Sequence, residues 1–151
     1  MRKIRSLSIP IAIVLWAATL CQARDLAIVV NKRNATASVT GAELEKFLKA
    51  GTPNWPDGKK VKIFLTDPGS ADNKTILQRV YKMAPAEIKS LLDAHRAEVQ
   101  VVGSDDLVLM MVSENPGALG VVNVYSITSQ VKVLKIDDKL PMEQGYLLHG
   151  N

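Results

Sequence analysis

Short apolar runs rich in β-branched residues alternate with helical patterns along most of this 151-residue chain. The first run, Leu26–Val30, is unbroken, and its length and composition favour a strand that is buried on both faces. Similar runs follow at residues 61–66, 99–102, 118–124 and 130–136. Strands that alternate with helices require crossover connections, so the pattern predicts an α/β fold with a mixed, mostly parallel sheet flanked by helices.

Four segments between these strands carry helical signals. Thr40 and Glu43 have the spacing of a capping box, and the apolar residues that follow at helical spacing end at Gly51. Further helices are predicted near residues 71–83, 85–95 and 105–113, and the last of these is capped by Ser104. Residues 146–148 are compatible with a last short strand. One domain accommodates all of these elements, because the chain contains no internal repeat and no low-complexity stretch.

The first 23 residues have the three-part layout of a secretory signal peptide. Residues 2–5 carry three basic side chains, residues 9–20 are apolar, and Cys21-Gln22-Ala23 offers small residues at the positions that a signal peptidase reads. A membrane-spanning helix needs roughly 20 apolar residues, so the short run favours a cleaved signal over a permanent anchor. We therefore expect cleavage after Ala23 and export to the periplasm, with residues 24–151 forming the mature domain.

Cleavage at that position changes the composition of the working protein. It leaves 128 residues, and loss of the three basic side chains lowers the formal net charge from +4 to +1. No block of like charge remains, which argues against a nucleic-acid partner. Cys21 is the only cysteine, so the mature chain forms no disulfide and depends on its core for stability. Lipidation at Cys21 is the alternative, but Leu20 stands where lipidation signals generally have a small residue.

The sequence gives little support for an enzyme, a metal site or a cofactor. Neither His95 nor His149 belongs to a recognisable triad or metal pattern. Zinc usually needs three or four ligands at tight spacing, and no such cluster is present in the sequence. The acidic pairs at 105–106 and 137–138 are isolated, and a helix cap and a turn explain them. We therefore expect no catalysis and no cofactor.

The most suggestive candidate site is the loop at residues 66–73. A glycine lets the backbone approach a ligand closely, and a helix start presents unpaired N–H groups that favour an anion. The candidate ligand-binding residues are Asp67, Gly69, Ser70, Ala71 and Asn73. The alternative is that Ser70 only caps its own helix. Asp72 favours this alternative, because its carboxylate would stand where the anion should bind.

The order of several short motifs resembles the phosphate-transporter type of periplasmic solute-binding protein. The segments that carry the resemblance are Leu26–Asn31, Val39–Leu44, Phe47–Gly51, Asn54–Gly58, Asp67–Ser70 and Asn115–Gly120. Together they span about residues 25 to 148. The resemblance implies a three-layer lobe of the type II binding-protein kind, with the helix start at Ser70 lining the ligand cleft.

The chain departs from this family in three places. Family members that hold phosphate have two lobes and about twice the length, whereas this chain resembles mainly one lobe. Their anion loop reads serine-glycine-threonine after an arginine, where this chain has Phe64-Leu65-Thr66 and then Ser70-Ala71-Asp72. An aromatic residue commonly follows the later glycine, and Val121 stands there instead.

Two functional hypotheses follow. In the first, the chain binds a small oxyanion such as phosphate at the backbone N–H groups near Gly69 and Ser70. In the second, the lobe has lost ligand binding and is an accessory module that docks a membrane transporter, a membrane sensor or another copy of itself. Oligomeric state is not predicted by either.

Overall fold

The structure is a computed structural model that describes residues 24–51 and 54–150. The predicted signal peptide and the predicted cleavage site after Ala23 lie outside the described residues. The strands are β1 (Leu26–Asn31), β2 (Ser38–Val39), β3 (Lys62–Leu65), β4 (Val99–Val101), β5 (Ala118–Asn123), β6 (Val131–Val133) and β7 (Lys135–Ile136). The helices are α1 (Gly41–Leu48), α2 (Lys74–Tyr81), α3 (Pro85–Ala94) and α4 (Asp105–Glu114), with a 3-10 turn η1 (Val124–Ser126). None of the helices in these ranges is long and apolar enough to span a membrane.

The central sheet has the strand order β4-β3-β5-β1-β6. β3 is parallel to both β4 and β5, whereas β1 is antiparallel to both β5 and β6. Four of the five strands therefore run in one direction and β1 runs against them. This confirms the predicted mixed, mostly parallel sheet.

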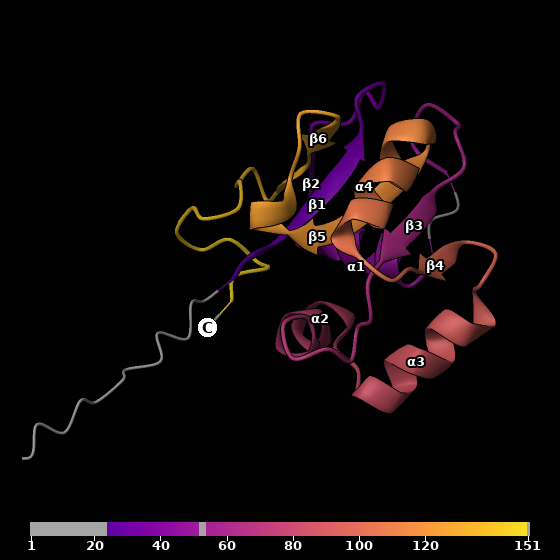
Figure 1. The fold of residues 1–151 in the computed structure, drawn as a ribbon, viewed down its shortest axis with the longest axis vertical. Helices are drawn as coiled ribbons and strands as arrows, with labels where there is room; N and C mark the ends of the chain where they lie inside the picture. Colours follow the sequence, from indigo (N-terminus) through magenta and orange to yellow (C-terminus); the bar gives the residue numbers. More distant parts are fainter. Residues whose placement is uncertain (1–23, 52–53, 151) are drawn as a thin grey trace, which may run out of the picture.

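Helices cover both faces of this sheet, so the domain has three layers. α4 lies across β5, β1 and β3 on the face that is nearest in Figure 1, while α1 lies behind the sheet. Along β1, Ala27 and Val29 pack with the α4 side, and Leu26, Ile28 and Val30 pack with α1, α2 and α3. All six residues of β1 are buried, which confirms the prediction of a strand covered on both faces.

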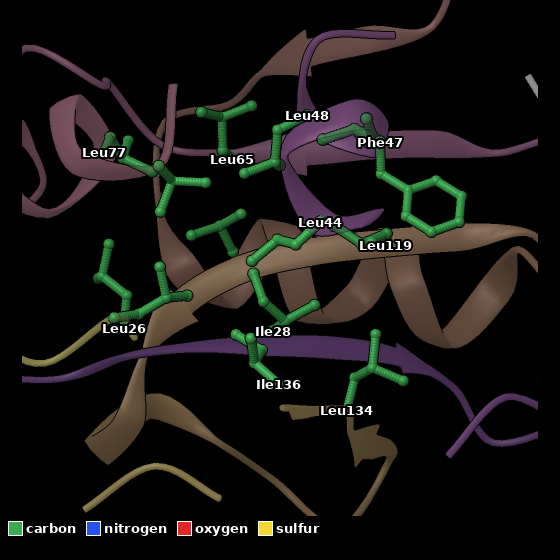
Figure 2. Close-up of a cluster of buried hydrophobic side chains, with 14 of the residues drawn as sticks. Leu26, Ile28, Leu44, Phe47, Leu48, Leu65, Leu77, Leu119, Leu134 and Ile136 are labelled. Carbon is green, nitrogen blue, oxygen red and sulfur yellow. The ribbon is translucent and has the colours of Figure 1, made fainter. Parts of the chain in front are cut away.

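The larger core lies between the sheet and helices α1 to α3 (Figure 2). α1 directs Leu44 and Leu48 toward β1 and β5, where they meet Ile28 and Leu119. The predicted capping box fixes the start of this helix: the Glu43 N–H donates to Thr40 Oγ1 at 3.2 Å, and the Thr40 N–H donates to Glu43 Oε2 at 2.7 Å. A local sequence signal thus orients the helix that supplies much of the core.

The smaller core lies under α4 and depends on a glycine. A Cβ at Gly120 in β5 would lie 2.7 Å from Val108 Cγ1 and 2.8 Å from Val112 Cγ2. Both valines are buried on the inner face of α4. Gly120, the last residue of the Asn115–Gly120 motif, therefore allows the helix to approach the sheet closely.

Two predicted strands are wrong in detail. Residues 130–136 form two strands, because the chain leaves β1 after Leu134, whose N–H donates to the Ile28 carbonyl at 2.8 Å, and β7 then pairs in parallel with β2 in a separate small sheet. Residues 146–148 form no strand. Tyr146 and Leu148 are nevertheless buried against the core. The Leu148 carbonyl accepts a backbone hydrogen bond from the Leu26 N–H at 3.0 Å.

Candidate functional site

A hollow of about 530 Å³ opens at one edge of the sheet, where β3 and β5 end. Thr66 follows β3 and Asn123 ends β5, while the antiparallel β1 brings Arg24 to the same edge. The full lining is Arg24, Thr66, Ser70, Asp72, Asn73, Asp105, Asn123, Tyr125 and Ser126. Open α/β sheets commonly bind ligands outside the carboxyl ends of their strands, so the position of this hollow marks it as the candidate site.

The loop that leads to α2 differs from the predicted helix start. α2 begins at Lys74 rather than near Ala71, and its N-cap position is held by Asn73, which has helical backbone angles and makes no side-chain cap bond. The interpretation of Ser70 as an N-cap is therefore wrong. The reason lies in Asn73: its buried side-chain amide donates to Thr66 Oγ1 at 2.9 Å and to the Asp67 carbonyl at 3.1 Å. These bonds hold residues 68–73 in turns.

The Asp67 carboxylate already binds the Gly69 N–H, one of the backbone groups that the sequence analysis assigns to an anion. The Gly69 N–H donates to Asp67 Oδ1 at 2.8 Å, and the Ser70 N–H donates to the Asp67 carbonyl at 3.2 Å. The loop thus satisfies part of its own backbone. The backbone N–H groups of Ala71 and Asp72 donate none of the loop's backbone hydrogen bonds, and both residues are exposed. The backbone N–H groups that make no such bond before α2 therefore lie two residues later than the sequence suggests.

The five predicted site residues do not gather in one place. Ser70 and Asn73 line the hollow, while Asp67 and Gly69 line a separate groove of about 450 Å³ beside α3. Ala71 is exposed and belongs to the lining of neither. Five lining residues were missed in the sequence analysis: Arg24, Asp105, Asn123, Tyr125 and Ser126. Thr66 and Asp72 belong to the predicted loop but were not assigned to ligand binding. Asn123 lies at the end of a predicted strand and Asp105 opens a predicted helix, so the strand-end rule for α/β sheets could have found both.

The charged side chains that line the hollow have opposite signs. Arg24 and Asp72 approach to 3.8 Å, with both side chains more than half exposed. An exposed pair of this kind contributes only about 0–1 kcal/mol. Asp105 Oδ2 accepts hydrogen bonds from the Asn123 N–H at 2.9 Å and from the Ser126 hydroxyl at 2.7 Å. Two carboxylates and one guanidinium therefore line the hollow, and any anion would meet repulsion as well as attraction.

Residues 24–51 and 54–150 contain no candidate metal cluster. No group of three or more histidine, cysteine, aspartate or glutamate side chains there could hold a metal ion. His95 directly follows α3, with its Nδ1 3.8 Å from Glu98 Oε2. The acidic pair at 137–138 lies in a turn, where Asp137 accepts from the Gly41 N–H at 3.0 Å.

Several solved structures have a fold similar to that of this chain. An ABC-type phosphate transport receptor from Vibrio cholerae matches 85% of this chain with a TM-score of 0.69 and 20% identity. PstS from Borrelia burgdorferi matches 85% with a TM-score of 0.68 and 19% identity. A putative phosphate ABC transporter substrate-binding protein from Clostridium perfringens, with bound phosphate, matches 77% with a TM-score of 0.63 and 16% identity. The fold resemblance predicted from the motif order is thus confirmed.

The matched region is only part of each of these proteins. It covers 54%, 55% and 46% of the three solved chains in the order given above, so this chain spans about half of their length. That share agrees with the single-lobe resemblance. No protein-family model matches the chain, and no curated protein matches it significantly.

Proposed function

We propose that this chain is a periplasmic solute-binding module whose hollow takes a small oxyanion, with phosphate as the first candidate. The observation that carries the proposal is that the Arg24 guanidinium and Asp72 line one hollow, where the Asp72 backbone N–H takes part in none of the loop's backbone hydrogen bonds. Backbone N–H groups before a helix and a guanidinium are the donors that oxyanions prefer. The fold likeness to phosphate-binding proteins supports the same ligand class.

Affinity in this hollow is expected to be weak. Asp72 and Asp105 carry the same sign as the ligand, and the Gly69 amide is already taken by Asp67. The Arg24 side chain is about half exposed, so water screens its charge. We expect a dissociation constant in the millimolar range, which corresponds to about 4 kcal/mol of binding free energy. A second lobe from another chain would be needed to exclude water.

Isothermal titration calorimetry tests this function. Protein from full-length expression is titrated with phosphate, sulfate and other oxyanions, after its N-terminus has been determined by mass spectrometry. Arg24→Ala is expected to weaken phosphate binding about two- to fivefold, the size of one exposed charge contact. Arg96→Ala is the matched control, because it removes the same charge from an exposed position of the chain after α3. Absence of any heat change at about 10 mM anion, where millimolar binding must register, would reject the proposal.

A second candidate function is that of an accessory module that docks a membrane transporter, a membrane sensor or a second copy. Exposed apolar side chains favour it: Leu107 and Met110 lie about one turn apart on the outer side of α4, and Tyr125 stands exposed at the hollow. Light scattering across a concentration series and capture from an envelope extract test this version. A Leu107→Ser, Met110→Ser double variant should lose the association. A strictly monomeric protein that captures nothing would exclude the docking function.

A further inference from the structure

The residue next to Arg24 is a buried carboxylate held by the far end of the chain. Asp25 is 4% exposed, and all three of its side-chain partners come from the tail segment, defined here as residues 141–150. The Met142 N–H donates to Asp25 Oδ2 at 2.7 Å, and the Gly150 N–H donates to Oδ1 at 3.1 Å. The His149 Nδ1 lies 2.7 Å from Oδ1. A buried carboxylate needs such partners, because an unpaired one is costly.

The tail segment is tied to the start of β1 by further bonds. The Leu26 N–H donates to the Leu148 carbonyl at 3.0 Å, and the Tyr146 hydroxyl donates to the Leu26 carbonyl at 2.9 Å. Arg79 of α2 donates to the His149 carbonyl. Figure 1 shows the yellow end of the chain beside the indigo start of β1. Segments more than 110 residues apart in the sequence are therefore held together beside Arg24.

Gly150 fits against the backbone of Arg24 without room for a side chain. A Cβ at Gly150 would lie 2.3 Å from the Arg24 carbonyl oxygen and 2.6 Å from the Arg24 nitrogen. Gly150 is buried, whereas the Arg24 side chain extends to the hollow. Gly150 of the tail segment therefore packs directly against the backbone from which the guanidinium projects.

We propose that the tail segment positions Arg24 for the hollow, and that Asp25 is the positioning residue through which the tail acts. The proposal deepens the oxyanion-binding function and rests on it. Release of the tail would leave the Asp25 side chain without its three partners and would remove Gly150 from the Arg24 backbone, while the Val124 N–H still donates to the Asp25 carbonyl at 3.0 Å. The positive charge at the hollow then becomes mobile, and the anion loses its fixed partner. The tail segment thereby controls the affinity of a site that it does not itself line.

The first experiment needs no ligand. The side-chain Nε–H of Arg24 is observed by nitrogen-15 NMR in wild type, Gly150→Ala and Gly103→Ala. Gly103→Ala is the matched control, because nothing lies within 4 Å of its added Cβ. The Arg24 resonance is expected to shift in Gly150→Ala and to stay in place in Gly103→Ala. A folded Gly150→Ala protein with an unmoved Arg24 resonance overturns the proposal.

A second pair of variants covers the case in which Gly150→Ala does not fold. His149→Ala removes the ring from Asp25, and the side chain is 59% exposed, so folding is expected to survive. His95→Ala, at a 39% exposed position after α3, is its control. Amide hydrogen exchange at Met142 and Gly150 should become faster in His149→Ala alone. Equal exchange in both variants counts against the tail acting through Asp25.

The third experiment tests whether the positioning of Arg24 by the tail segment affects phosphate binding. Phosphate affinity is measured in a double-mutant cycle of Gly150→Ala and Arg24→Ala. Gly150→Ala alone is expected to weaken binding about two- to fivefold and to have no further effect in the Arg24→Ala background. Additive losses overturn the positioning role. If wild type binds no phosphate, the binding function fails, and the NMR comparison still decides whether the tail positions Arg24.

Discussion

The indole N–H of Trp55 donates to the carbonyl oxygen of Gly117 at 2.9 Å, across 62 residues of sequence. The Trp55 ring also packs on Phe47, with ring centroids 4.7 Å apart and an interplanar angle of 36°. A Cβ at Gly117 would lie 2.0 Å from the Lys60 carbonyl oxygen, so only glycine fits there. Three of the motifs that carry the family resemblance therefore meet in one structural contact, which holds the sheet rather than a ligand.

Trp55→Phe tests this contact. The variant keeps an aromatic ring beside Phe47 and removes the donor to Gly117, so we expect a loss of about 0.5–1.5 kcal/mol of unfolding free energy, with an added packing loss. Urea denaturation followed by circular dichroism measures it. Tyr125→Phe, at an exposed position, serves as the reference and should change stability by less than about 0.5 kcal/mol. Equal stability of the two variants would contradict a role for the indole bond.

Gly120→Ala tests the close approach of α4 to the sheet. The added methyl group overlaps Val108 and Val112, so overpacking is expected to cost about 1–3 kcal/mol. Gly103→Ala is the control, because its methyl group meets open space, and there we expect a neutral or slightly stabilising effect. Thermal and urea unfolding of the two variants make the comparison. A Gly120→Ala protein as stable as wild type would mean that α4 shifts without cost.

Ser104→Ala and Ser70→Ala separate a helix cap from a residue of the hollow. Ser104 Oγ accepts from the Leu107 N–H at 3.3 Å, so its loss is expected to cost about 0.5–2 kcal/mol. Ser70 caps no helix, so its replacement should leave unfolding free energy within about 0.5 kcal/mol of wild type. Any fall in phosphate affinity in Ser70→Ala then reports the site itself. A large stability loss in Ser70→Ala would refute the structural account of this loop.

Two buried tyrosines predict a loss of stability at alkaline pH. Burial raises the pKa of both the Tyr81 and the Tyr146 phenols above the ordinary value of about 10. The two phenols have their full effect on the unfolding free energy below about pH 10, because both the folded and the unfolded chain then keep the phenol protons. Above that pH the unfolded chain loses its protons first, so unfolding free energy should fall by up to about 1.4 kcal/mol per pH unit for each tyrosine.

Replacing single tyrosines by phenylalanine shows which residue causes the loss of stability at alkaline pH. Within the described residues the Tyr81 hydroxyl has no hydrogen-bond partner, so Tyr81→Phe sacrifices no bond and should leave stability at pH 7 equal or slightly higher. It should also reduce the slope above pH 10. Tyr125→Phe, whose side chain is exposed, should leave the slope unchanged. Urea midpoints between pH 8 and pH 11.5 measure both, and identical slopes in all three proteins would contradict the assignment.

Local sequence patterns correctly predicted the elements that depend on interactions between residues close together in the chain. The buried strand β1, the Thr40–Glu43 capping box and the Ser104 cap follow from residues close to one another in the chain, and the structure confirms each. The α/β layering also follows, because alternating strands and helices leave few ways to bury their apolar faces.

Contacts between distant segments decided the rest. Asn73 holds Thr66 and the Asp67 carbonyl, and this moves the start of α2 away from Ser70. The antiparallel position of β1 brings Arg24 to the ends of β3 and β5, and the folded tail segment supplies the partners of the Asp25 side chain. Periodicity and capping report interactions over three or four residues, whereas these contacts depend on strand order and close packing in three dimensions. The sequence alone therefore determined the layers, and the tertiary structure decided which side chains share the hollow.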